Sequence, residues 1–150
     1  MADPAEARDT STRPRDAALG SGPGRLLLTV YIIFAVAAGA RAAVQIATKF
    51  SEAPLAYILS AVAAVIYIAA TVGLAVGGTR GRLIALTSCS IELIGVLLVG
   101  TLSIGDKKAF PDQTVWSDYG SGYGYIPLVL PMIGLYWLWR NRPKPQITEG

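Results

Sequence analysis

Apolar and polar positions divide the chain into four long apolar runs separated by short polar connections. The run Leu83–Leu102 reads LIALTSCSIELIGVLLVGTL, and an apolar segment of this length crosses a bilayer as a helix. Runs at about 26–47, 55–76 and 125–139 have the same character. The pattern predicts an all-α membrane protein, a bundle of four transmembrane helices with an aromatic and glycine-rich extracytoplasmic loop at 103–124.

Polar segments precede and follow these runs. Residues 1–24 are rich in Ala, Pro, Gly and opposite charges, and such a segment buries too little apolar surface to fold. We expect a disordered cytoplasmic tail there, a transmembrane domain over 25–142, and a solvated cytoplasmic tail at 143–150. The first run imitates a signal peptide with a small-residue site near Ala38–Ala40, but its apolar character continues past that site. An uncleaved signal-anchor helix is therefore expected.

Small residues recur at every fourth position in two of the runs. Ala35, Gly39, Ala43 and Ala47 form one such series, and Ala69, Gly73 and Gly77 form another. This spacing lets a second helix approach closely, although Ala-rich membrane helices also show it by chance. We expect helix packing at Gly39, Ala43, Gly73 and Gly77. The following segment, 77–82, reads GGTRGR and predicts a tight basic turn that makes an antiparallel hairpin of the second and third helices.

Composition and charge support the membrane class and indicate an orientation. Hydrophobic residues make up 53% of the chain and charged residues 15%, against about 25% charged residues in soluble domains. The net charge of +3 is modest, and the basic residues lie at segment ends, so they indicate topology and not nucleic-acid binding. The expected inside holds nine basic residues: Arg8, Arg13, Arg15, Arg25, Arg80, Arg82, Arg140, Arg142 and Lys144. The expected outside holds Lys49, Lys107 and Lys108. This bias predicts a multi-pass protein of the cell membrane with both termini cytoplasmic.

The residue types argue against catalysis and metal binding. The chain contains no histidine, which is the commonest general base and metal ligand. Its one cysteine, Cys89, has no partner for an internal disulfide. The loop glycines in GSGYG have neither dinucleotide-binding nor Walker spacing. We therefore expect neither an enzyme nor a bound metal or cofactor.

Four polar residues within the apolar runs are the first candidate site. A carboxylate such as Glu92 at mid-depth costs roughly 2.5–3.5 kcal/mol, so it should face other helices. Depths counted along the runs suggest that Arg41, Tyr67 and Glu92 form a polar cluster, with Gln45 one turn from Arg41. Three interpretations remain open: a structural lock between helices, an Arg41 that snorkels to the outer surface while Glu92 is protonated and locally hydrogen-bonded, or an ion or proton pathway.

The outer loop is the second candidate site. It carries Asp112, Trp116, Asp118, Tyr119 and Tyr123, and its aromatic residues suit a segment at the membrane interface. Asp112 and Asp118 lack the spacing of a calcium loop. The loop is interpreted either as a cap packed over the helix bundle or as a lid that binds a ligand or partner.

Two segments resemble a known group of proteins. KFSEAPLAYILSAVAAVIY, and FPDQTVWSDYGSGYGYIPLVLP followed by GLYWLWR, are similar to small actinobacterial four-helix integral membrane proteins. The resemblance extends from about Gly24 to about Arg142 and is most specific in the loop motif. It implies a four-helix membrane envelope but no mechanism, because the group has no assigned activity.

The leading functional hypothesis is non-catalytic. Small-residue faces suit an accessory or scaffolding subunit that contacts the lipid bilayer and other membrane proteins or a second copy of itself. One alternative is a small oligomeric transporter or channel that uses Arg41 and Glu92. Another is a cell-envelope sensor whose outer loop binds a ligand.

Overall fold

The computed structural model describes residues 22–143, and this part of the chain is helical, with no strands. The tails expected at 1–24 and 143–150 lie largely outside the described residues. The elements are α2 (Gly22–Lys49), α3 (Pro54–Val76), α4 (Gly78–Gly105), the 3₁₀ helix η1 (Ser117–Tyr123) and α5 (Ile126–Arg140).

Three of these helices are long and apolar enough to cross a membrane. They are α2 with 28 residues, α3 with 23 and α4 with 28, and they indicate a multi-pass membrane protein. α5 is apolar but has only 15 residues. At 1.5 Å per residue it is about 22 Å long, less than the roughly 30 Å of a bilayer's hydrocarbon core. A fourth crossing therefore remains a prediction.

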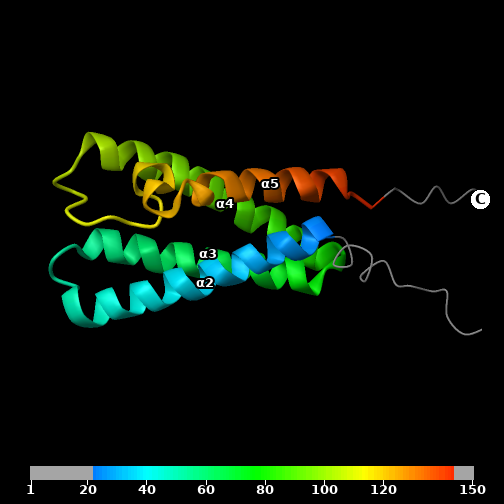
Figure 1. Ribbon diagram of the computed structural model, residues 1–150, viewed down its shortest axis with the longest axis horizontal. Coiled ribbons are helices and arrows are strands. Elements are labelled where there is room, and N and C mark those ends of the chain that lie inside the picture. Colours follow the sequence, from blue (N-terminus) through cyan, green and yellow to red (C-terminus); the bar gives the residue numbers. More distant parts are fainter. Residues whose placement is uncertain (1–21, 144–150) are drawn as a thin grey trace, which may run out of the picture.

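The helices run alternately up and down the long axis of the molecule (Figure 1). α2 packs mainly against α3, whereas α4 packs against α3, α5 and η1. α4 begins beside α3 and ends beside η1, so it joins the two halves of the molecule (Figure 1). α2 begins and α5 ends at the same end of the molecule (Figure 1).

The connection between α3 and α4 is shorter than the sequence suggests. Gly77 and Gly78 have φ values of 63° and 66°, in the left-handed region that glycine tolerates best. α4 then starts at Gly78, so Arg80 and Arg82 lie in its first turns and not in a loop. Gly77 thus serves the turn through its backbone conformation, and not as a helix-packing residue as expected.

Small residues bring α3 and α4 into close contact. A methyl group added at Gly73 would lie 2.6 Å from the backbone nitrogen of Ala85 and 2.8 Å from the carbonyl oxygen of Gly81. A side chain at Gly73 would force the two helix backbones apart, which is the physical reason for glycine there.

The small residues of α2 behave differently. Ala43 is exposed, and a methyl group added at Gly39 would meet no other atom within 4 Å. The expected packing at Gly39 and Ala43 therefore does not occur within the described part of the chain. Ala43 and Ala47 face away from the other helices, whereas Ala35, the first residue of the series, is buried.

The segment η1 fills the space that the short α5 leaves beside α4. Asp118, Tyr119 and Gly120 have φ values of 49°, 59° and 80°, which make a left-handed turn. Non-glycine residues in this region cost about 1–3 kcal/mol each, so the surroundings must hold them. The Asp118 backbone N–H donates to Ser103 Oγ at 2.9 Å, and the Tyr119 ring packs directly on Gly100.

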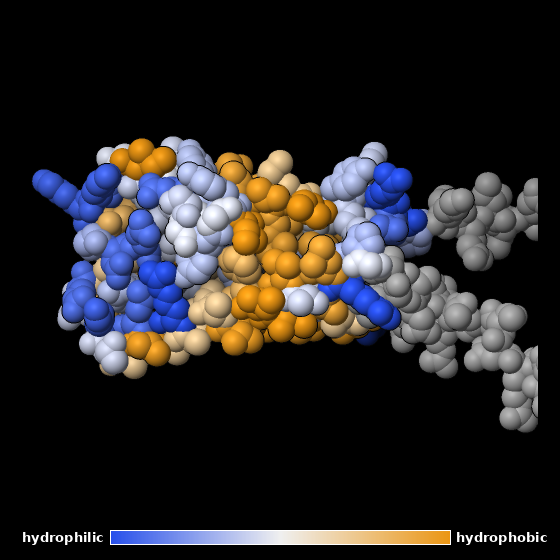
Figure 2. All heavy atoms as spheres, in the orientation of Figure 1, coloured by the Kyte–Doolittle hydropathy of each residue, from blue (hydrophilic) through white to orange (hydrophobic). Residues whose placement is uncertain are grey.

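The visible surface is divided into three zones (Figure 2). A hydrophobic belt crosses the middle of the molecule, and hydrophilic residues cover both ends. At the end where the loop lies, the hydrophilic zone extends over η1. This division is the one expected of a helical protein whose middle lies in the hydrocarbon core of a bilayer.

Candidate functional site

Glu92 forms the first polar group, deep between α2 and α4. Its side chain is completely buried, with 0% of its surface exposed. The Tyr31 hydroxyl, from α2, donates a hydrogen bond to Glu92 Oε2 at 2.8 Å and lies 3.2 Å from Cys89 Sγ. We call Tyr31, Cys89 and Glu92 the inner polar cluster. All three residues have 0% exposure, so the cluster is sealed within the helices.

The inner polar cluster is closed on its third side by α5. A methyl group added at Gly134 would lie 3.0 Å from Cys89 Sγ and 3.5 Å from the Tyr31 hydroxyl. Glycine there lets α5 pack directly over the cluster. Glu92 Oε1 is also buried but has no hydrogen-bond partner among the described residues. An apolar setting strengthens the remaining bond from Tyr31, because no water competes for it.

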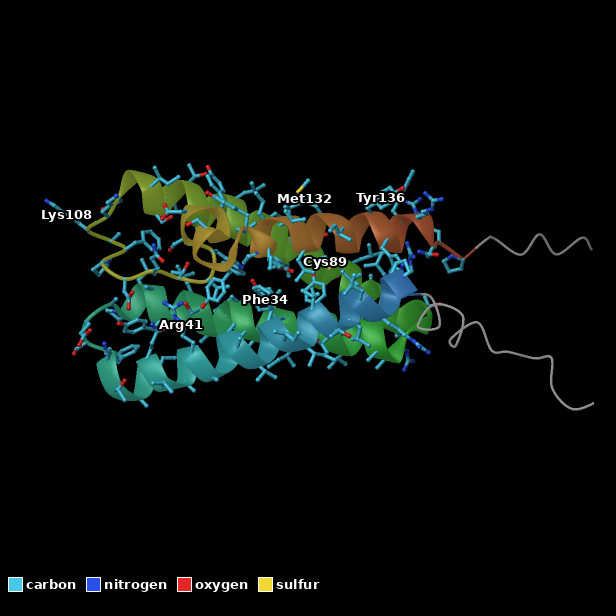
Figure 3. All side chains as sticks on the ribbon, in the orientation of Figure 1. Phe34, Arg41, Cys89, Lys108, Met132 and Tyr136 are labelled. Carbon is cyan, nitrogen blue, oxygen red and sulfur yellow. The ribbon has the colours of Figure 1, made fainter. Side chains whose placement is uncertain are left out.

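Arg41 forms the second polar group, nearer the loop end of the molecule (Figure 3). Its Nη1 donates to the Tyr123 hydroxyl at 2.6 Å, and its Nη2 donates to the Gln113 carbonyl oxygen at 3.4 Å. The guanidinium also lies over the Tyr123 ring, 5.8 Å from its centroid, in a cation–π arrangement. One arginine of α2 thus fastens two separate points of the loop.

Asp112 extends this network towards α3. Its Oδ2 accepts a hydrogen bond from the Tyr57 hydroxyl at 3.0 Å and a long one from Gln45 Nε2 at 3.5 Å. The carboxylate therefore joins α2, α3 and the loop at one point. We call Arg41, Gln45, Tyr57, Asp112, Gln113 and Tyr123 the outer cap network.

Aromatic side chains fill the space between the two polar groups. Tyr67 packs against Tyr31 and Phe34, with ring centroids 6.3 Å and 5.8 Å apart. Phe34 also packs against Tyr123 at 5.9 Å. The Trp116 indole N–H donates to the Tyr67 hydroxyl at 3.2 Å. Figure 3 shows Phe34 between Arg41 and Cys89, which lie towards opposite ends of the molecule.

The single cluster expected for Arg41, Gln45, Tyr67 and Glu92 is therefore divided. Arg41 and Gln45 belong to the outer cap network, Glu92 belongs to the inner polar cluster, and Tyr67 bonds to Trp116. The reason is that helical side chains lean towards the N-terminus of their own helix. Glu92 leans towards the start of α4 and Tyr67 towards the start of α3, which are opposite ends of the molecule.

A comparison of the chain with models of known protein families, with curated proteins and with solved structures found no match. The resemblance to small actinobacterial membrane proteins therefore stays a prediction from sequence.

The loop residues expected at an interface are used mainly inside the protein. Trp116 is only 3% exposed, and its ring lies against Gly95 of α4. Tyr119 and Tyr123 are half-buried, with hydroxyls that pair with Thr101 and Arg41. Asp118 is half-buried, and its backbone N–H donates a hydrogen bond to Ser103 of α4. The geometry is that of a cap packed onto the helices.

The sequence prediction of the site did not include Tyr31, Cys89 and three glycines that the structure places there. Cys89 lies three positions before Glu92, so the two share a face of α4, a spacing that sequence alone could reveal. Tyr31 is the partner that depth counting missed, because that count ignored the lean of Glu92. Gly95, Gly100 and Gly134 receive other side chains, but nothing in their sequence context distinguishes them from other glycines.

Among residues 22–143, no three His, Cys, Asp or Glu side chains come close enough to hold a metal ion. The Cys89 thiol and the Glu92 carboxyl are enclosed, without access for a substrate from solution. What both polar groups do is connect helices: α2 with α4 in the inner polar cluster, and α2 with α3 and the loop in the outer cap network.

Proposed function

We propose that this protein is a non-catalytic subunit of the cell membrane, which crosses the bilayer four times and packs as an accessory or scaffolding component against other membrane proteins. The observation that carries the proposal is the open stripe of small residues on α2. Ala43 and Ala47 are exposed, and Gly39 has free space around it. Within a bilayer, such a stripe lets the backbone of a second helix approach closely.

The interior of the helices supports a packing role over transport. Tyr31, Tyr67 and Glu92 are all 0% exposed and together fill the middle of the bundle. Arg41 and Glu92, the two charged residues that a pathway would use, bond to different partners and are separated by a layer of aromatic rings. We therefore interpret the inner polar cluster as a lock that sets the register of α2 and α4.

The outer loop supports the same conclusion. A sensor loop would present polar and aromatic groups to solution, whereas here the Trp116 ring and the Tyr123 hydroxyl bond inside the protein. The outer cap network connects the loop to both α2 and α3. We infer that the loop stabilises the outer end of the helices.

Charge supports the orientation with both termini in the cytoplasm. The end where α2 begins and α5 ends carries Arg25, Arg80, Arg82, Arg140 and Arg142, and no acidic residue among those described. The connections at the loop end carry only three basic residues: Lys49, Lys107 and Lys108. An excess of basic residues marks the cytoplasmic side of a membrane protein.

Native purification followed by mass spectrometry tests the proposal. The tagged chain, extracted in mild detergent, should bring down one or more membrane proteins in a constant ratio. Gly39→Leu combined with Ala43→Leu should abolish this association while the isolated chain keeps its melting temperature, because both positions are open. Val65→Leu, on an exposed position of α3, is the matched control and should retain the partner. A double variant that still co-purifies with the same proteins would contradict the proposal.

A further inference from the structure

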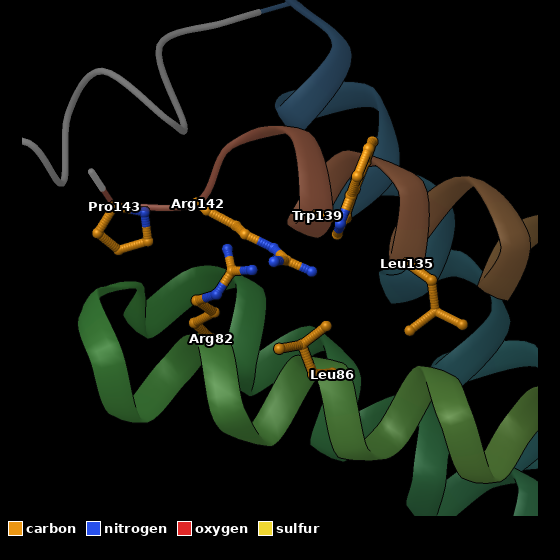
Figure 4. A pocket seen from close by; sticks show the side chains of 6 residues that line it. All are labelled: Arg82, Leu86, Leu135, Trp139, Arg142 and Pro143. Carbon is orange, nitrogen blue, oxygen red and sulfur yellow. The ribbon is translucent and has the colours of Figure 1, made fainter. Parts of the chain in front are cut away.

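A pocket of about 530 Å³ lies between α4 and α5, at the end of the molecule where α5 terminates (Figure 4). It is open to the surface and is separate from both polar groups described above. Its lining residues come from the first turns of α4 and the last turns of α5 with the residues that follow: Arg82, Leu86, Leu135, Trp139, Arg142 and Pro143.

Two guanidinium groups share this pocket. Arg82 Nη1 donates to the Asn141 carbonyl oxygen at 3.4 Å, and the Arg142 guanidinium lies 5.5 Å from the centroid of the Trp139 ring. These contacts draw both side chains to one opening, where their positive charges repel each other. Placing two like charges together is unfavourable unless an anion joins them.

No acidic group in the described part of the chain neutralises this pair. Glu52, Asp106, Asp112 and Asp118 lie at the loop end of the molecule, and Glu92 is sealed in the inner polar cluster. The pair therefore complements an anion from outside residues 22–143. Guanidinium groups bind phosphate especially well, because their planar fork makes two parallel hydrogen bonds to its oxygens.

The remaining walls of the pocket are apolar. Leu86 and Leu135 line it between the two helices, and Trp139 stands at its edge with 58% of its surface exposed (Figure 4). The hydrophobic belt of the molecule begins beside this end (Figure 2). A pocket with cations at its mouth and leucines on its membrane side fits a molecule that has an anionic head and a hydrocarbon tail.

We propose that this pocket binds an anionic phospholipid of the surrounding leaflet. The phosphate lies between Arg82 and Arg142, and an acyl chain lies against Leu86 and Leu135. Trp139 is placed at headgroup depth, where the indole ring is favoured. The bound lipid would join the start of α4 to the end of α5. Among the described contacts, the hydrogen bond from Arg82 to Asn141 is the only one that connects these two segments.

Native mass spectrometry of the full chain, titrated with phosphatidylglycerol in detergent, tests this proposal. The wild-type protein should retain one lipid. Arg82→Gln with Arg142→Gln should weaken retention by about tenfold or more, since both charged hydrogen-bond donors to the phosphate are lost. Arg80→Gln with Arg140→Gln removes the same charge from the same end but outside the pocket lining, and should change retention by less than about twofold.

Two further probes distinguish the possible sources of the phosphate. Glycerol 3-phosphate, which has the headgroup chemistry but no acyl chain, should not compete with the lipid. Phosphatidylcholine, whose headgroup has no net charge, should bind more weakly than phosphatidylglycerol. The proposal is overturned if the control pair loses the lipid equally, if the soluble phosphate competes, or if the two lipids bind alike.

Discussion

The Tyr31 hydroxyl donates a hydrogen bond to Oε2 of Glu92 at 2.8 Å, and both side chains are fully buried. This bond joins α2 to α4 across the middle of the protein. It also gives the buried carboxyl its one hydrogen-bond partner among the described residues, since Glu92 Oε1 has none. The structural role of Glu92 therefore depends on Tyr31.

Replacing Tyr31 with Phe should destabilise the protein by about 1–3 kcal/mol, because it leaves a buried acceptor without a donor. Glu92→Met should also be destabilising, because it leaves the Tyr31 hydroxyl, a buried donor, with only Cys89 Sγ beside it. The double variant should cost less than the sum of the two by about 1 kcal/mol or more, since no unpaired group remains. Unfolding in detergent measures all three, and strictly additive effects would refute the coupling.

Alanine at two glycines should have opposite effects. Gly73→Ala should lower stability by about 1–3 kcal/mol, because the new methyl group meets the backbone of Ala85 and Gly81. Gly39→Ala should be neutral or stabilising by up to about 1 kcal/mol, since alanine favours the helix and the site is open. Melting temperatures of the purified chains provide the test. Equal losses at both positions would show that the packing of α3 on α4 is not as described.

A methyl group at Gly95 should displace the Trp116 ring, which it would approach to 2.7 Å. In a background with Trp137 and Trp139 replaced by Phe, Gly95→Ala should shift Trp116 fluorescence to longer wavelength, because the indole becomes hydrated. Gly105→Ala lies on the same helix with no atom nearby, and it serves as the control. An unchanged spectrum in the Gly95 variant would contradict the insertion of Trp116 beside α4.

Substitutions at Arg41 and at its partner Tyr123 should destabilise the outer cap network by different amounts. Tyr123→Phe removes one acceptor but keeps the ring against Phe34, so we expect a loss of about 1 kcal/mol. Arg41→Met removes both hydrogen bonds and the cation–π contact, so its loss should be larger. Hydrogen exchange of residues 112–123 should rise in the same order. A reversed order would mean that Arg41 does not hold the loop.

The native cysteine should be inert to thiol reagents. Cys89 is 0% exposed in the inner polar cluster, so a maleimide should modify it only after unfolding.

The orientation can therefore be mapped with single added cysteines and no change at residue 89. Lys108→Cys should react with an impermeant reagent added to intact cells, whereas Arg80→Cys should react only after the membrane is opened. Labelling of both from outside would refute the proposed orientation.

Apolar runs were sufficient to predict three helices that are long and apolar enough to cross a membrane, because burial of the backbone in lipid allows few other structures. The insertion cost of a carboxyl also led to a sheltered Glu92. Neither argument selects the partner of Glu92. That choice depends on the lean of each side chain along its helix, and the same depth rule that suggested Tyr67 favours Tyr31 once the lean of Glu92 is included.

The loop could not be predicted at the same level. Its left-handed residues Asp118 and Tyr119 have no sequence signal, since non-glycine residues rarely adopt this conformation. Their conformation depends on contacts with α4: the hydrogen bond from Asp118 to Ser103 and the packing of Tyr119 on Gly100. Sequence identified the aromatic residues of the loop but not the glycines of α4 that receive them.

α5 leaves the ribosome after α2, α3 and α4, and at about 22 Å it is too short to bridge the hydrocarbon core by itself. The irregular backbone of η1 must also be shielded by protein wherever it meets lipid. Both segments therefore need the finished surface of α4, with Gly95 and Gly100 already in place to receive Trp116 and Tyr119. We therefore expect η1 and α5 to dock only after α2, α3 and α4 have folded, and substitutions on this surface of α4 should interfere with that docking step.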